Sequence, residues 1–142
     1  MLLMLAALLT AAPLAESAAH APKPRSPACA VVEVRSDQAP RAWYRFRATR
    51  ILDLEFETRV VGRRHDAHAP QLRLYTPDGF LYQVLETRPQ AHRGGQRRFE
   101  ARLPVAGTSI MMNGLYGRWR VVPHLDNGRE ACGPARSFVI RP

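Results

Sequence analysis

One segment of the chain sets basic and aromatic side chains at a spacing suited to anion binding. Its alternate residues are Arg41, Trp43, Arg45 and Arg47. Because successive side chains of a β-strand point to opposite faces, a strand here would place these four together, opposite Ala42, Tyr44 and Phe46. Guanidinium groups bind phosphate, sulfate or carboxylate through paired hydrogen bonds, and a Trp ring stacks on sugars and bases. The segment therefore predicts an anion-binding strip, which Arg118 and Arg120 would extend.

The same pattern is also typical of an ordinary solvated strand face. In that alternative Trp43 packs on a loop, and the arginines pair across a sheet with the acids of a later strand, Asp53, Glu55 and Glu57. Opposite charges are favoured on neighbouring strands, and such exposed pairs contribute little stability. We favour this alternative from the sequence.

Histidines and methionines supply two weaker candidates for metal binding. His65, Asp66 and His68 lie in a polar segment, and His92 lies in another. A His-x-x-His pair with a carboxylate can bind Zn or Cu, but such a site needs a third or fourth fixed ligand. Met111 and Met112 offer thioethers to Cu(I), yet adjacent methionines more often fill a core or an interface. We therefore expect no metal and no other cofactor.

The sequence contains no recognisable catalytic arrangement. Ser109 and Ser137 lack the context of a nucleophile elbow. We find no paired carboxylates outside a charge-alternating strand and no glycine-rich phosphate loop. The expectation is a protein that is not an enzyme.

The chain is strongly basic, with a formal charge of +9 over 142 residues. Lys23 is the only lysine among 21 basic residues, and the arginines are spread along the chain instead of forming a block. Such a charge can steer a protein to nucleic acid, anionic glycan or an acidic membrane surface. A general bias of the composition toward arginine also explains the even spread of these residues. From the sequence alone we favour this explanation.

The first 19 residues resemble a secretory signal peptide. They form an apolar stretch too short to span a bilayer, followed by small residues. Cleavage after Ala19 is preferred to cleavage after Ala21, which would put Pro22 just after the cut; an uncleaved anchor is the alternative. Residues 20–28 contain three prolines and predict an extended tether. We therefore expect an exported protein, periplasmic or extracellular at the cell surface, with no transmembrane span in the mature chain.

Two cysteines, Cys29 and Cys132, remain after the leader. In an exported protein an isolated pair favours a disulfide, here between the start of the first strand and the start of the last. Closing a loop of about 100 residues would stabilise the fold by roughly 3–5 kcal/mol. Two free thiols, or a metal pair with histidine, are the alternatives.

Short runs with one apolar face follow one another from residue 29 to the end. The strongest signal is Asn127-Gly128 between two β-prone runs, which predicts a hairpin; Trp119 and Val121 share one face of its first arm, and Phe138 and Ile140 share one face of its last arm. Pro77-Asp78-Gly79 predicts a second hairpin, and residues 105–117 a connection with one helical turn. The expected apolar faces of the earlier strands are Ala30, Val32 and Val34; Ala42, Tyr44 and Phe46; Leu52, Leu54 and Phe56; Leu72 and Leu74; and Phe99, Ala101 and Leu103. About seven to eight such strands predict one all-β domain, an antiparallel sandwich over residues 29–142.

Four stretches resemble bacterial exported immunoglobulin-like domains of the fibronectin-III or macroglobulin type. They are residues 74–79, 103–108, 117–121 and 137–140, so the resemblance covers residues 72–142. It implies an immunoglobulin-like fold and a role in adhesion, assembly or spacing. The expected disulfide departs from the intersheet pair of antibody domains.

These observations rank three functions. The first is an exported, non-catalytic binding or accessory module that contacts a protein partner in the cell envelope. The second is a binder of anionic polymer, a glycan in preference to nucleic acid, through Arg41, Trp43, Arg45, Arg47, Arg118 and Arg120. The third is a periplasmic metal-binding protein.

Overall fold

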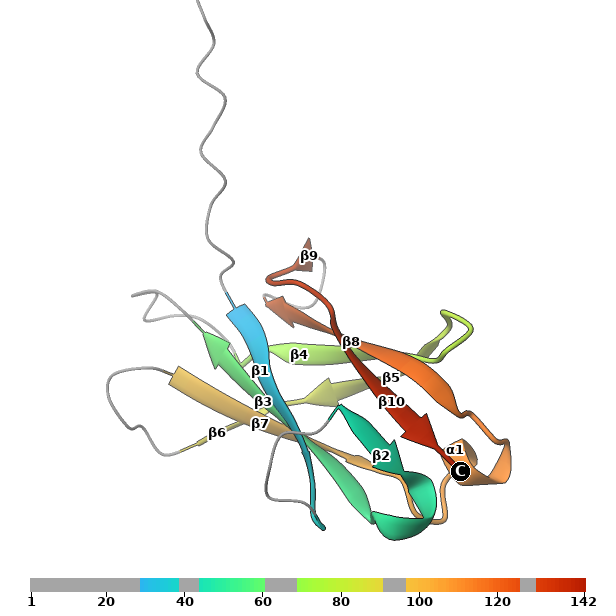
Figure 1. Ribbon diagram of the computed structural model, residues 1–142. Coiled ribbons are helices and arrows are strands. Elements are labelled where there is room, and N and C mark those ends of the chain that lie inside the picture. Colours follow the sequence, from blue (N-terminus) through green and yellow to red (C-terminus); the bar gives the residue numbers. More distant parts are fainter. Residues whose placement is uncertain (1–28, 39–43, 61–68, 91–96, 126–129) are drawn as a thin grey trace, which may run out of the picture.

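The computed structural model describes residues 29–38, 44–60, 69–90, 97–125 and 130–142. Within these residues the chain forms two β-sheets packed face to face (Figure 1). The four-stranded sheet has the order β1 (Cys29–Ser36), β3 (Asp53–Val60), β7 (Arg97–Pro104) and β6 (Arg88–Pro89). The six-stranded sheet has the order β2 (Arg45–Arg47), β10 (Arg136–Arg141), β8 (Gly117–Leu125), β4 (Gln71–Tyr75) and β5 (Leu81–Glu86), and β9 (Glu130–Ala131) pairs with β8.

The expected all-β sandwich is confirmed, with two differences in detail. The described residues contain ten strands, because two-residue strands β6 and β9 join the ladders. β6 lies where the sequence predicts only a loop. The sheets are also not purely antiparallel, since β2 runs parallel to β10. After β1, the next strand, β2, belongs to the six-stranded sheet, where it pairs with β10, the last strand in the sequence.

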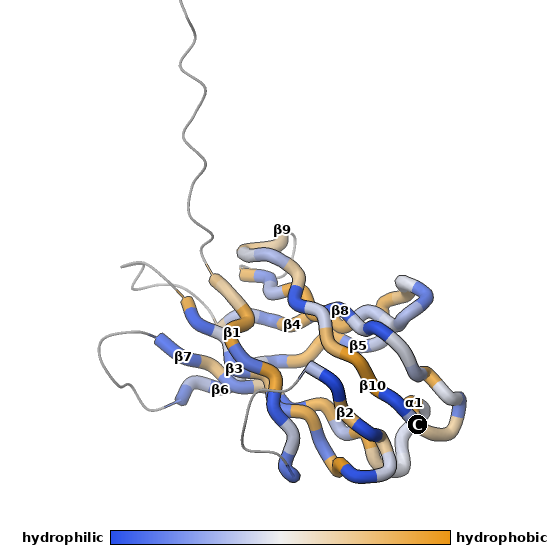
Figure 2. The backbone as a smooth tube through the Cα atoms, viewed as in Figure 1, coloured by the Kyte–Doolittle hydropathy of each residue, from blue (hydrophilic) through white to orange (hydrophobic). Residues whose placement is uncertain are grey.

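The core lies between the sheets and is built from the inward side chains of both. Figure 2 shows hydrophobic and hydrophilic residues alternating along the strands. Trp119, Phe138 and Phe56 are fully buried: Trp119 stacks on Phe138 with ring centroids 6.2 Å apart, and Phe138 meets Phe56 edge to face at 5.5 Å. The indole N–H of Trp119 donates to the Leu115 carbonyl at 2.9 Å, which satisfies the one polar group of that ring.

Both predicted hairpin regions pair as antiparallel strands. Trp119 of β8 lies opposite Phe138 of β10, and β9 pairs with the end of β8. The predicted Asn127-Gly128 turn falls outside the described residues. In the other hairpin, between β4 and β5, the Gly79 N–H donates to the Thr76 carbonyl, and Gly79 has φ +88°, which favours glycine. The expected helical turn is α1 (Ser109–Met112).

Several inward positions differ from the alternation read in the sequence. In β1 a bulge between Val31 and Glu33 shifts the phase, so Cys29 and Val31 are buried first and Val34 after them. Val32, expected in the core, is therefore only half-buried. Tyr44 and Leu52 precede β2 and β3 and are exposed, because each strand begins one residue later than its apolar run.

The predicted disulfide between Cys29 and Cys132 is confirmed. It joins β1 to the segment after β9, instead of the start of the last strand, and closes a separation of 103 residues. Cys29 N–H donates to the Cys132 carbonyl at 3.0 Å, and Cys132 N–H donates to Pro123 at 2.9 Å. Gly133 is required here, because a Cβ at that position would lie 1.9 Å from the Cys29 carbonyl oxygen.

The expected signal peptide (1–19) and tether (20–28) lie outside the described residues. Across the part of the chain that the structure describes, none of the helices has the length and apolar character to cross a bilayer.

Candidate anion-binding surface

The structure places part of the predicted strip in the six-stranded sheet. Arg45 and Arg47 lie on β2, both exposed, with Phe46 buried between them. Arg41 and Trp43 fall outside the described residues. β2 is beside β10 and not beside β3, so the expected pairing of Arg45 and Arg47 with the acids of β3 is wrong.

Strand register brings Arg118 and Arg120 to the same outer face. Arg45 lies opposite Val139 of β10, and Val139 lies opposite Arg118 of β8. Two residues further along β8, Arg120 lies opposite Ser137 on one side and Tyr75 of β4 on the other. Residues two apart on a strand are separated by about 6.6 Å, so the register brings these cations together on one face.

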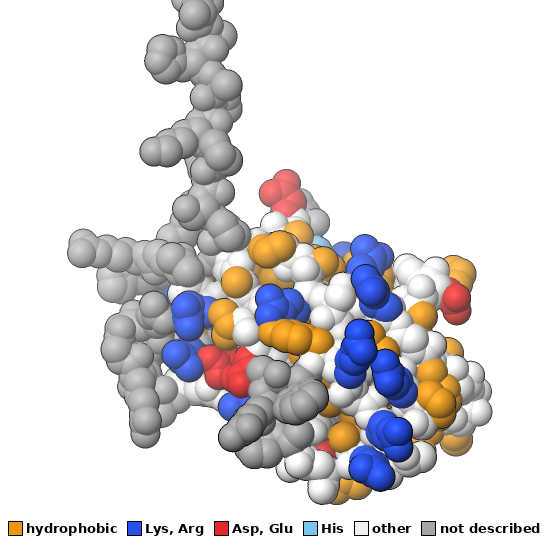
Figure 3. All heavy atoms as spheres, in the orientation of Figure 1, with side chains coloured by type: hydrophobic (Ala, Val, Ile, Leu, Met, Phe, Trp, Pro, Cys, Tyr) orange, Lys and Arg blue, Asp and Glu red, His pale blue; other side chains and the backbone are white. Residues whose placement is uncertain are grey.

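One further arginine completes this array. Arg141 of β10 lies directly opposite Arg47 in the parallel ladder, and both are exposed. We name as the basic face the exposed outward arginines of β2, β8 and β10: Arg45, Arg47, Arg118, Arg120 and Arg141. In Figure 3 a row of Lys and Arg side chains runs over the area where β8, β10 and β2 lie.

The charges of the basic face are not compensated within the sheet. None of its five arginines forms an ion pair with a carboxylate of the described residues. Arg120 instead stacks on the Tyr75 ring, with its guanidinium 5.4 Å from the ring centroid. Like charges opposite one another destabilise a sheet, so the Arg47 and Arg141 pair has a cost in the free protein. An anion bound across the face would remove that cost.

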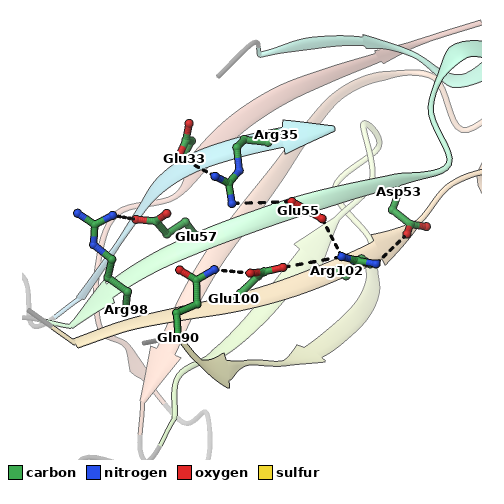
Figure 4. A network of polar contacts seen from close by, with 9 residues as sticks. All are labelled: Glu33, Arg35, Asp53, Glu55, Glu57, Gln90, Arg98, Glu100 and Arg102. Atoms are coloured by element: carbon green, nitrogen blue, oxygen red, sulfur yellow. Dashed lines mark hydrogen bonds and ion pairs between the residues drawn. The ribbon is translucent and has the colours of Figure 1, made fainter. Parts of the chain in front are cut away.

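The outer face of the four-stranded sheet is organised in the opposite way (Figure 4). Arg102 of β7 contacts Glu55 of β3 at 2.8 Å and Asp53 at 3.6 Å. Arg35 of β1 reaches Glu55 from the other side, at 3.8 Å. Two of the acids expected to pair with the arginines of the solvated strand face, Asp53 and Glu55, are thus held by arginines of their own sheet.

A second pair belongs to the same outer face. Arg98 contacts Glu57 at 2.8 Å, and the Glu57 side chain is only 7% exposed. Acidic and basic groups therefore balance locally on this sheet, whereas the basic face has no such partners. The net positive charge of the described domain is concentrated on one side.

One carboxylate outside these ladders has an altered pKa. Burial acts to raise the pKa of Asp37, but hydrogen bonds donated by the backbone N–H groups of Leu52 and Asp53 and by the Gln38 side chain outweigh it and lower the pKa. Asp37 thereby fixes the entry into β3. Its role is structural.

Among the remaining sequence candidates, those that the structure describes form no site. His65, Asp66, His68 and His92 lie outside the described residues, and the described ones contain no group of three His, Cys, Asp or Glu suited to a metal. Met111 packs against the core as expected, but Met112 is 74% exposed. Ser109 shares a hydrogen bond of 2.7 Å with the Tyr82 hydroxyl.

A hollow of about 490 Å³ lies where the chain passes from β5 to β6. Its lining includes Gln90, Glu100 and Arg102. Gln90 donates a hydrogen bond to Glu100, and Arg102 is held by the acids of β3. These groups satisfy one another, so the hollow is a weaker candidate than the basic face.

Sequence reasoning missed Arg141, although a signal for it exists. Ser137, Val139 and Arg141 alternate with the buried Phe138 and Ile140, which marks them as outward positions. What the alternation does not reveal is that β2 is the strand next to β10 in the sheet.

Comparison with protein-family models, with curated proteins and with solved structures finds no match to this chain.

Proposed function

We propose that this protein is a non-catalytic binding module whose basic face holds an anionic polysaccharide. The observation that carries the proposal is the set of five exposed arginines on one sheet face with no carboxylate partner among the described residues. Several guanidinium groups on one face match a linear polymer that repeats sulfate, phosphate or carboxylate groups.

A glycan fits this face better than a nucleic acid. Proteins that hold single-stranded nucleic acid stack bases on exposed aromatic rings. Beside the face, the described aromatic rings include Tyr75 and Tyr44, and the guanidinium groups of Arg120 and Arg136 already lie over them. The face therefore offers charge contacts more than stacking contacts.

The fold and the disulfide support an exported module of the immunoglobulin-like class. The sheet orders β1-β3-β7-β6 and β10-β8-β4-β5 correspond to A-B-E-D and G-F-C-C′ of the immunoglobulin sandwich. The disulfide favours an oxidising compartment, such as the periplasm or the cell surface. We therefore place the ligand in the cell envelope or outside the cell.

Binding of a protein partner is the second candidate. It is favoured by β5, an edge strand whose Val84 side chain is 40% exposed. An edge strand can accept a strand of another chain through its backbone groups. This mode would depend little on salt, in contrast to binding by the basic face.

The test is retention of the oxidised full chain on dextran sulfate, with neutral dextran as the reference matrix. The variant Arg118→Ser/Arg120→Ser should lose most of the retention. The matched control, Arg35→Ser/Arg102→Ser, removes the same charge from the other sheet and should bind like the parent protein. Equal losses in both variants would show that net charge, and not the basic face, causes retention.

A further inference from the structure

One end of the sandwich gathers most of the exposed large hydrophobic side chains of the described residues. We call it the apolar end and define it by Leu52, Phe80, Leu81 and Met112, whose exposed fractions are 60, 73, 52 and 74%. At this end β3, β5 and β8 begin and β4, β7 and β10 finish. Scattered single hydrophobic residues are normal on a surface, but a group on adjoining loops indicates a contact site.

The loops that carry these side chains touch one another. Next to Leu81, Tyr82 shares a hydrogen bond with Ser109, the first residue of α1, and Met112 ends that helix. The Leu52 carbonyl accepts hydrogen bonds from Val105 at 2.8 Å and from Ala106 at 3.1 Å, just before α1. The segments that carry the four side chains are thus linked to α1 or to the residues just before it.

Local hydrogen bonds hold these loops in place. In the β4–β5 turn, Thr76 N–H donates to the Phe80 carbonyl at 2.9 Å, and the Thr76 hydroxyl accepts from the Phe80 N–H. The Thr108 hydroxyl accepts from Ile110 N–H and donates to the Val105 carbonyl at 2.8 Å. A loop that is already ordered loses little further conformational entropy when its apolar side chain binds a partner.

Basic side chains border the apolar end. They are Arg47 at the end of β2, Arg50 just after it, Arg118 near the start of β8 and Arg141 at the end of β10. Hydrophobic atoms and arginines adjoin at the right-hand margin of Figure 3.

The acids at this end are fewer and mostly engaged. Asp37 accepts backbone hydrogen bonds, and Asp53 contacts Arg102 at 3.6 Å. Asp78 lies in the β4–β5 turn, two residues before Phe80. The border of the apolar end therefore remains net basic.

We propose that the apolar end docks on a membrane surface that contains anionic lipid. Phe80, Leu81, Leu52 and Met112 enter the boundary between headgroups and acyl chains, where apolar side chains leave water. The surrounding arginines contact lipid phosphates, with their aliphatic stems alongside the apolar tips. Charge complementarity, together with apolar residues at turns and at the ends of elements instead of on a sheet face, favours a lipid surface over a protein.

This inference goes beyond polysaccharide binding and uses a different group of side chains. Arg47, Arg118 and Arg141 border both surfaces, but the apolar tips belong to the end alone. A domain docked in this way would hold the basic face roughly upright beside the membrane. Loss of lipid binding by tip variants and loss of polymer binding by Arg118→Ser/Arg120→Ser therefore report on separate proposals.

The test is cosedimentation of the oxidised full chain with phosphatidylcholine vesicles, with and without phosphatidylglycerol. We expect binding only to the vesicles with phosphatidylglycerol. The variant Phe80→Ser/Met112→Ser should weaken that binding by roughly tenfold or more, and its retention on dextran sulfate should not change. The matched control is Val84→Ser, which removes an exposed apolar side chain of β5 away from the apolar end.

Three results would overturn the proposal. One is no binding to the anionic vesicles by the parent protein, which would leave a protein partner as the occupant of the apolar end. Another is an equal loss in Val84→Ser. The third is full vesicle binding by Phe80→Ser/Met112→Ser, which would mean that charge alone attracts the protein. Thermal unfolding of each variant shows that a loss of binding is not a loss of fold.

Discussion

Salt dependence offers the sharpest check on polysaccharide binding by the basic face. Each anionic group that an arginine neutralises releases condensed counterions. With five arginines in contact, log K should fall against log salt with a slope of about −3.5 to −4.5, taking roughly 0.7 to 0.9 per contact. Raising salt from about 50 to about 200 mM would then weaken binding by roughly 100- to 500-fold.

Isothermal titration calorimetry with dextran sulfate at several salt concentrations measures this slope. In Arg118→Ser/Arg120→Ser the slope should become shallower by about 1.4 to 1.8, because two contacts are lost. Arg35→Ser/Arg102→Ser, from the four-stranded sheet, should leave it unchanged. A parent slope shallower than about −1 would refute the reasoning, since so few contacts would not need the array.

Four further predictions concern the stability of the fold. Replacing Cys29 and Cys132 by Ser should lower the free energy of unfolding by about 3–5 kcal/mol, measured by urea titration of the oxidised parent and the variant; an unchanged midpoint would contradict it. Gly133→Ala should lower the melting temperature, because its Cβ would lie 1.9 Å from the Cys29 carbonyl oxygen. A melting curve like that of the parent would show that the backbone moves apart without loss of stability. Glu57→Gln should cost about 1 kcal/mol, since it weakens a charged hydrogen bond of a nearly buried carboxylate, and urea titration that finds no loss would mean that solvent screens this pair. Because the pKa of Asp37 is lowered in the folded protein, the unfolded chain binds a proton at higher pH than the folded chain does. The stability that the Asp37 carboxylate contributes is therefore present at neutral pH and is lost as pH falls below the ordinary value of 3.8. Acid titration of Asp37→Asn should not show this loss.

Much of the fold can be predicted from local patterns. Leu72 and Leu74 alternate with polar residues and form the buried side of β4, and Pro77-Asp78-Gly79 forms the turn that follows. These predictions succeed because strand faces and tight turns depend on neighbours two to four residues away. The class of fold follows from the number of one-faced strands.

The bulge in β1 shows where this reasoning stops. The alternation of Val32 and Val34 predicts that both are buried, yet the ladder with β3 slips after Val31. A one-residue slip moves every later side chain to the other face. Since the partner strand is more than 20 residues away in the sequence, the local pattern does not contain this information.

Only part of the candidate site was predictable, because local alternation does not reveal which strands are neighbours. The sequence alone determined that Arg45, Arg47, Arg118 and Arg120 alternate with apolar residues, and that the two cysteines are suited to a disulfide. It also determined the total charge, because that depends on composition alone. Only the tertiary structure decided that β2 joins β10, which separates these arginines from the acids of β3. Pairing between strands is set by the packing of distant segments, and so the concentration of charge on one face and of apolar side chains at one end arises only in the folded chain.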